Sequence, residues 1–89
     1  MPTPRYDVIA KVISQKGHCA NGHKVGDEWR FSKTSPEGLC LTALNAIFPD
    51  IRVLTFGGSH SWSNDPESCT VACPDGDNPV IFELRRVRE

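Results

Sequence analysis

The sequence lacks a charge excess of either sign. Ten Lys and Arg residues stand against eleven Asp and Glu residues, which gives a formal net charge of −1 over 89 residues. Proteins that bind nucleic acid or anionic membranes through electrostatics carry a strong basic excess or a basic face. A small basic cluster at Arg85, Arg86 and Arg88 is typical of the solvated end of a strand. We therefore expect neither nucleic acid nor a membrane as a partner.

Long apolar runs are also missing. No segment approaches the roughly 18 apolar residues that a transmembrane helix needs. No apolar run follows the first five residues, as one would in a signal peptide. The sequence thus predicts a cytoplasmic protein, and cytoplasmic thiols stay reduced. Its four cysteines then favour metal or redox chemistry over a disulfide framework.

Several familiar catalytic motifs are absent as well. The sequence contains no G-x-S-x-G elbow, no phosphate-binding glycine loop and no H-E-x-x-H pair. It also has no internal repeat and no low-complexity tract, so residues 1–89 are expected to form a single domain. A chain of this length has a small core, for which a metal ion or a homo-oligomer contact would supply extra stability.

Hydrophobic patterning predicts an α+β fold. Apolar and polar residues alternate over 5–14, 28–32 and 80–87, which indicates strands, and residues 51–56 before a Gly-Gly pair indicate another. A helix should begin at 34–37, where Thr34 and Glu37 fit a capping box, and end at Phe48, because Pro49 follows. We expect one helix packed on a small, mostly antiparallel four-stranded sheet.

A long segment without lasting periodicity separates Gly57 from Pro79. Loops this long are usually functional or disordered, and its histidine, tryptophan and cysteines are a poor composition for disorder. We therefore expect a long ordered loop before the last strand, with a short extended piece at 69–73. Cys69 and Cys73 could meet across a turn as a disulfide or a metal pair, or Cys69 could be incidental.

Four scattered side chains form the main candidate site. Thiolate and imidazole ligands suit zinc or iron, and we expect a metal ligand set of Cys19, His23, Cys40 and Cys73. The first two are close in the sequence, whereas the others come from the expected helix and the late loop. The alternative is structural, because Cys40 lies on the apolar stripe of that helix, where a cysteine acts as a small hydrophobic residue.

Two further residues are candidates for catalysis beside that centre. Asp75 could orient a ligating histidine or act as an acid or base, and His60, near Trp62, could line a pocket. An open metal position there would permit Lewis-acid or hydrolytic chemistry. Two alternatives remain. One is a metal-free isomerase, lyase or cyclase that acts on a small organic molecule through Cys40 or Cys73 with His23, His60 and Asp75. The other is an oligomeric binding module.

Several motifs taken together resemble a family of small microbial proteins without a settled activity. That family is marked by a GHKVGD segment, which this chain has at 22–27, by a GLC or GIC helix start, here 38–40, and by a late CPD, here 73–75. The resemblance spans nearly the whole chain in order. It implies that the motif positions include Cys19, His23, Cys40, Cys73 and Asp75.

Overall fold

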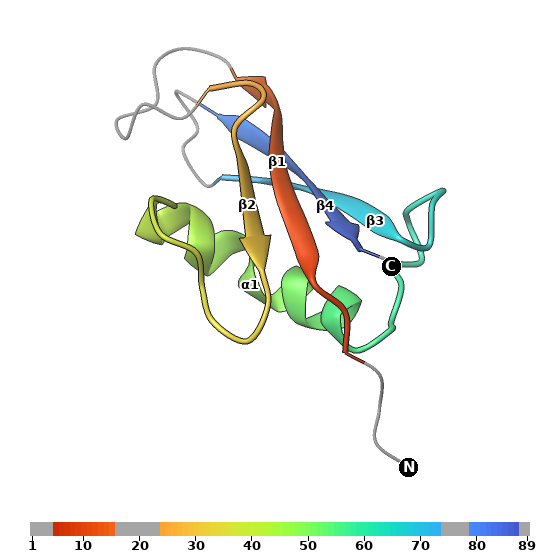
Figure 1. Ribbon diagram of the computed structural model, residues 1–89. Coiled ribbons are helices and arrows are strands. Elements are labelled where there is room, and N and C mark those ends of the chain that lie inside the picture. The colour runs from red at the N-terminus through yellow and green to blue at the C-terminus, as the bar shows by residue number, and fades with distance from the viewer. Residues whose placement is uncertain (1–4, 16–23, 74–78, 88–89) are drawn as a thin grey trace.

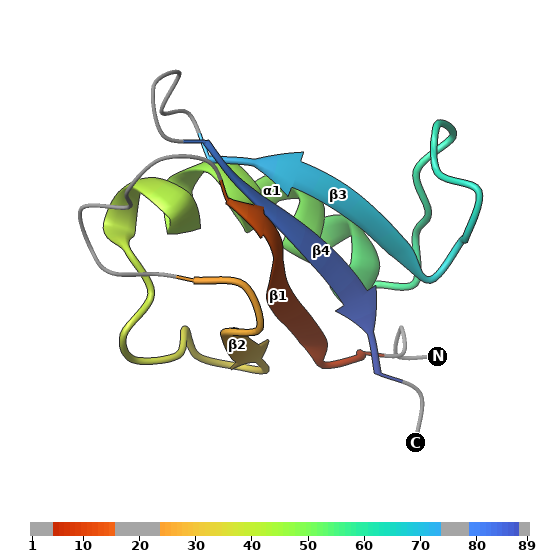
Figure 2. The same ribbon diagram turned by 90° about the horizontal axis from the view of Figure 1, so that it is seen from above.

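The computed structural model describes residues 5–15, 24–73 and 79–87. Within these residues the chain forms β1 (Val8–Gln15), β2 (Glu28–Phe31), α1 (Leu41–Thr55), β3 (Ser68–Ala72) and β4 (Val80–Arg86). The strands make a four-stranded sheet in the order β2-β1-β4-β3, and each neighbouring pair is antiparallel. Helix α1 lies across one face of this sheet (Figures 1 and 2). The predicted α+β class, with one helix on a four-stranded antiparallel sheet, is confirmed.

The core lies between α1 and the two central strands. Alternate residues of β1 and β4 point at the helix, as their sequence pattern predicted. The buried apolar residues are Val8, Ala10 and Val12 of β1, Phe31 of β2, Cys69 of β3, Val80, Phe82 and Leu84 of β4, and Ala43, Ile47, Ile51 and Leu54 of α1. The opposite face of the sheet carries charged residues such as Lys11 and Glu83, which face each other across β1 and β4.

The helix runs through Pro49, so the predicted helix end at Phe48 and the predicted strand at 51–56 are wrong. Ile47, Ile51 and Leu54 continue one buried stripe at helical spacing. Burying each of these side chains contributes about 1.5–3 kcal/mol. Together they outweigh the roughly 3 kcal/mol that a proline costs inside a helix. Pro49 itself is exposed, and its ring lies on the side of α1 that faces water.

The helix also begins later than predicted. Its first residue is Leu41, and Cys40 occupies the N-cap without a side-chain hydrogen bond to the helix. Gly38 has a φ of +84°, a left-handed conformation that interrupts any helix started at Thr34 or Pro36. The predicted capping box therefore precedes a turn, and α1 starts three residues after Gly38.

A Schellman turn ends the helix at Gly57 and Gly58. The Gly58 N–H donates to the Val53 carbonyl at 2.9 Å, and the Gly57 N–H donates to the Leu54 carbonyl at 3.2 Å. Gly57 has a φ of +85°, and a Cβ atom on Gly58 would lie 3.0 Å from the Val53 carbonyl oxygen. The Gly-Gly pair thus ends a helix, where the sequence pattern had indicated the end of a strand. The fourth strand is β3 instead, at the position of the predicted extended piece.

Candidate metal centre

Three potential metal ligands meet beside the last turns of α1. They are Asp50 of α1, His60 of the segment after the helix, and Cys69 of β3. One ligand atom from each lies within 4.8 Å of the other two. This cluster, which we call the Asp50 cluster, could hold a metal ion. Its members come from parts of the chain that only the tertiary structure brings together.

The turn after α1 sends the chain back along the helix and so places His60. Its imidazole Nε2 lies 2.9 Å from Asp50 Oδ1. A carboxylate can only accept a hydrogen bond, so Nε2 carries the proton when Asp50 is ionised. The ring of Trp62 packs against the imidazole, with 4.8 Å between ring centroids. The Ser63 N–H donates to the His60 carbonyl at 3.1 Å and closes a further turn.

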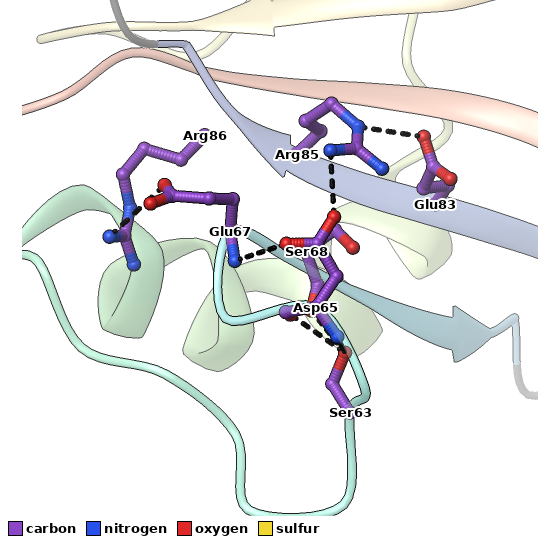
Figure 3. A network of polar contacts seen from close by, with 7 residues as sticks. All are labelled: Ser63, Asp65, Glu67, Ser68, Glu83, Arg85 and Arg86. Carbon is purple, nitrogen blue, oxygen red and sulfur yellow. Dashed lines mark hydrogen bonds and ion pairs between the residues drawn. The ribbon is translucent and has the colours of Figure 1, made fainter.

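A polar network holds the end of this segment against the sheet (Figure 3). The Ser63 hydroxyl donates to the Ser68 carbonyl at 2.7 Å, and Asp65 Oδ1 accepts the Glu67 N–H at 2.9 Å. Arg85 of β4 donates to Asp65 Oδ2 at 3.0 Å. The Glu67 N–H, and then the Arg85 guanidinium, hold the pKa of the Asp65 carboxyl below its ordinary value. These bonds position the segment that carries His60.

Buried Arg86 ties the same segment down from the other side. Its guanidinium donates to the Gly58 carbonyl and lies 3.3 Å from the Glu67 carboxylate. It also stacks over the Tyr6 ring, 5.4 Å from the centroid. The side chain is 3% exposed, so this arginine is a structural residue of the core. The chain is therefore fixed at Gly58 and again at Glu67, on either side of His60.

The cluster is buried, and its burial sets its chemistry. The side chains of His60 and Asp50 are 3% and 25% exposed, and Cys69 is 3% exposed. Burial, with a smaller contribution from the negative charge of Asp50, raises the pKa of the Cys69 thiol to about 11. Without a metal the thiol is thus protonated at neutral pH. It is a poor nucleophile in that state, because the thiolate is the reactive form.

One ring nitrogen of His60 stands out within the described part of the chain. Nδ1 is buried and has no hydrogen-bond partner there. Buried polar atoms are usually paired, and leaving one unpaired costs about 1–3 kcal/mol. A neutral imidazole that donates through Nε2 has a lone pair on Nδ1, which is the form that binds metals. Nδ1 points away from Asp50, so an ion shared with Asp50 would bind Nε2 instead, in exchange for the hydrogen bond that Nε2 now makes.

The structure brings together only part of what the sequence predicted. Cys19, His23 and Asp75 lie outside the described residues, so the four-ligand site remains a prediction. Cys40, at the N-cap of α1, and Cys73, just after β3, are half-buried and pack against the core. Neither belongs to the ligand cluster found among the described residues. His60, a predicted catalytic candidate, does belong to it.

Sequence reasoning missed Asp50 and left Cys69 undecided. Asp50 lies beyond the helix end predicted at Phe48, although the apolar stripe continues at Ile51 and Leu54. If the predicted helix is continued through Pro49 to the glycines at 57 and 58, the chain after it is expected to turn back toward Asp50. Cys69 is a free thiol, so it forms no disulfide with Cys73.

Comparison with protein-family models, with curated proteins and with solved structures gave no match. The family resemblance drawn from the motifs therefore stays a prediction. Over the described residues, no helix has the length and apolar character required to cross a membrane. The chemistry of the site must then be argued from its own residues.

Proposed function

We propose that this protein is a small metal-binding domain in which Asp50, His60 and Cys69 bind a divalent transition metal ion, with zinc the best fit and iron the alternative. The observation that carries the proposal is the convergence of a carboxylate, an imidazole and a thiol within 4.8 Å. Zinc binds this combination of oxygen, nitrogen and sulfur ligands, and imidazole also suits iron. Single carboxylates and histidines are common without a metal, but this set adds a buried cysteine.

Charge balance supports the proposal. A Cys69 thiolate and an Asp50 carboxylate together carry two negative charges, which a divalent ion would neutralise. Burial of separate charges is costly, whereas burial of a neutral cluster is not penalised in the same way. The ion would displace the thiol proton of Cys69. Because the pKa of this thiol is raised in the free protein, metal binding competes with the proton and depends on pH.

The distances require a modest rearrangement. Zinc lies about 2.0–2.3 Å from its ligands, which places the ligand atoms of a tetrahedral site about 3.3–3.8 Å apart. The bond of 2.9 Å between His60 and Asp50 would open slightly, and any pair near the 4.8 Å limit would close by about 1 Å. Three protein ligands leave the fourth position to water or a substrate, as in catalytic zinc sites. Lewis-acid or hydrolytic chemistry is thus the class of reaction that we propose for an open site.

The deciding experiment is elemental analysis of protein purified without added metal, followed by titration of the chelator-treated protein with Co²⁺. We expect close to one equivalent of bound metal and a thiolate-to-cobalt charge-transfer band. Cys69→Ser should remove that band and weaken binding by a factor of 100 or more. Cys73→Ser is the matched control, because it changes a half-buried cysteine four residues further along and should keep the band.

Two outcomes would contradict the proposal. One is less than about 0.2 equivalents of metal together with no cobalt band. The other is a band that survives Cys69→Ser but is lost in Cys40→Ser and Cys73→Ser, which would favour the four-ligand site predicted from the sequence. Asp50→Asn provides a second variant that preserves shape, and it should weaken metal binding while circular dichroism shows an unchanged fold.

A further inference from the structure

A pocket of about 470 Å³ opens between α1, the end of β2 and the segment that follows β2. None of the three residues of the Asp50 cluster lines it. The cluster takes Cys69 from β3, whereas the pocket takes Phe31 from β2, and these strands form opposite edges of the sheet. In Figure 1 the chain between β2 and α1 arches over this side of the helix. The pocket is therefore a separate site.

The inner surface of the pocket is apolar. Phe31 is buried there, and Leu44 and Ile51 of α1 form the wall beside it. Leu41 and Phe48, also from α1, line the pocket with 78% and 49% of their surface exposed. Large apolar side chains gathered in a concave surface are typical of a ligand site, and the volume lies in the usual range for small molecules. The body of a fitting ligand is apolar.

The charged residues around the pocket are all basic. Arg5, Lys33 and Arg52 line it, and the lining includes no Asp or Glu. Arg52 stacks over the Phe56 ring at 4.8 Å from its centroid, and Arg5 stacks over the same ring at 5.4 Å. Stacking holds the guanidinium groups in place without neutralising their charge. They can still donate hydrogen bonds to an anion.

The other arginines of the described chain differ in this respect. Arg30 pairs with Asp7, Arg85 with Asp65, and Arg86 with Glu67. Within the described ranges, Arg5 and Arg52 have no carboxylate partner, and both lie at the pocket. Arg5 and Arg52 are both exposed, so water solvates them in the free protein and their charges are available to an anion from outside the chain.

We propose that this pocket binds a small organic carboxylate with an apolar body, such as a medium-chain fatty acid or an arylalkanoic acid. The apolar tail packs against Phe31, Leu44 and Ile51, and the carboxylate accepts hydrogen bonds from Arg52 and Arg5. Guanidinium groups recognise carboxylates through two parallel N–H···O bonds, and these charge-assisted bonds are stronger than neutral ones. The proposal does not depend on the metal site.

The test compares three probes with one tail and different head groups: decanoate, 1-decanol and decyltrimethylammonium. Each is titrated below its aggregation limit into the chelator-treated full chain, with calorimetry for affinity and amide chemical shifts for location. We expect decanoate to bind at least tenfold more tightly than decanol, and the cation to bind more weakly still. The largest shifts should fall in residues 31–35 and 41–55.

Arg52→Gln should lower the affinity for decanoate about tenfold and leave the affinity for decanol unchanged, since it removes a charge-assisted bond to the head group. Arg30→Gln is the matched control, because that arginine is exposed and does not line the pocket. It should change neither affinity.

Equal binding of decanoate and decanol, shifts centred elsewhere, or no binding at millimolar decanoate would each overturn the proposal. None of these results would affect the metal proposal, because metal is measured separately. The comparison of the three head groups uses the unmodified protein. It therefore tests whether the pocket prefers a carboxylate even if a variant folds poorly.

Discussion

The two sides of α1 differ in nearly every physical respect. Toward β3, the Asp50 cluster is largely buried and rich in metal ligands, with a histidine that is 3% exposed in its side chain. Toward β2, the pocket is open, apolar inside and basic at its rim. Asp50 belongs to the cluster, whereas the next two residues, Ile51 and Arg52, line the pocket. Successive helical residues point about 100° apart, so neighbours in the sequence reach different surfaces.

The two sites also differ in how their residues are held in place. The cluster depends on a segment fixed by the Ser63, Asp65 and Arg86 contacts, which set its geometry before any ligand arrives. The pocket, in contrast, is open to water, and Leu41 and Phe48 of its apolar lining are largely exposed. A fixed set of ligands suits the strict geometry of a metal ion, whereas an open apolar pocket suits molecules of variable shape. One small core supports both.

The largest expected effect comes from removing that shared support. Leu54→Ala leaves a cavity under the last turn of α1, at a side chain that is fully buried. We expect the free energy of unfolding to fall by about 2–5 kcal/mol in urea denaturation. Val53→Ala, at the partly exposed neighbouring residue, is the control and should cost less than about 1 kcal/mol. Two separate unfolding transitions would show that the sites do not share one cooperative core.

The second largest expected effect is a difference between the two sites in how ligand affinity depends on pH. The pKa of Cys69 is about 11, so metal must displace its thiol proton, and apparent metal affinity should rise about tenfold per pH unit between pH 7 and 9. Decanoate affinity should stay flat over this range, because neither carboxylates nor guanidinium groups change charge there. Metal affinity is measured by competition with a chelator of known affinity, and decanoate affinity is measured by calorimetry. A flat metal profile would argue against Cys69 as a ligand.

The raised pKa of the Cys69 thiol also predicts that the stability of the metal-free protein changes with pH. The folded-state pKa of Cys69 lies above the ordinary value of 9.0, so its contribution to stability is complete below pH 9.0 and is lost as pH rises toward about 11. Metal-loaded protein should lack this loss, because its thiolate is already formed. Chemical denaturation of both forms at alkaline pH tests the difference.

The smallest expected effect is coupling between the sites. Cys69→Ser should change decanoate affinity less than twofold, and Arg52→Gln should change metal affinity less than twofold, because no residue is shared. Isothermal titration of each ligand with each variant measures this. A larger reciprocal effect would mean that α1 shifts on binding and links the sites.

The fold was predictable wherever one physical signal dominated. Alternation fixed β1, β2 and β4 to within a few residues, because the buried face of each strand had to meet α1. The helix was misjudged at both ends, where local rules competed with burial. Pro49 argued for an end that the buried Ile51 and Leu54 overruled, and Gly38 prevented the start that Thr34 suggested.

The candidate site was less predictable than the fold. His60 is a candidate on the sequence alone, but Asp50 is hidden by the misplaced helix end, and the sequence offers Cys69 only Cys73 as a partner. Ligands at 50, 60 and 69 match no short metal-binding spacing. The resemblance and the ligand chemistry pointed to Cys19, His23, Cys40 and Cys73, and this set remains to be tested.

The sequence by itself determined the class of the fold, the inward faces of β1, β2 and β4, and the presence of soft metal ligands. These properties follow from short-range patterns of hydrophobicity and from residue chemistry. The tertiary structure alone decided that Asp50, His60 and Cys69 meet, and that Arg5, Lys33 and Arg52 surround one pocket. Such meetings depend on where α1 ends and how it lies across the sheet, which is set by burial summed over the whole core.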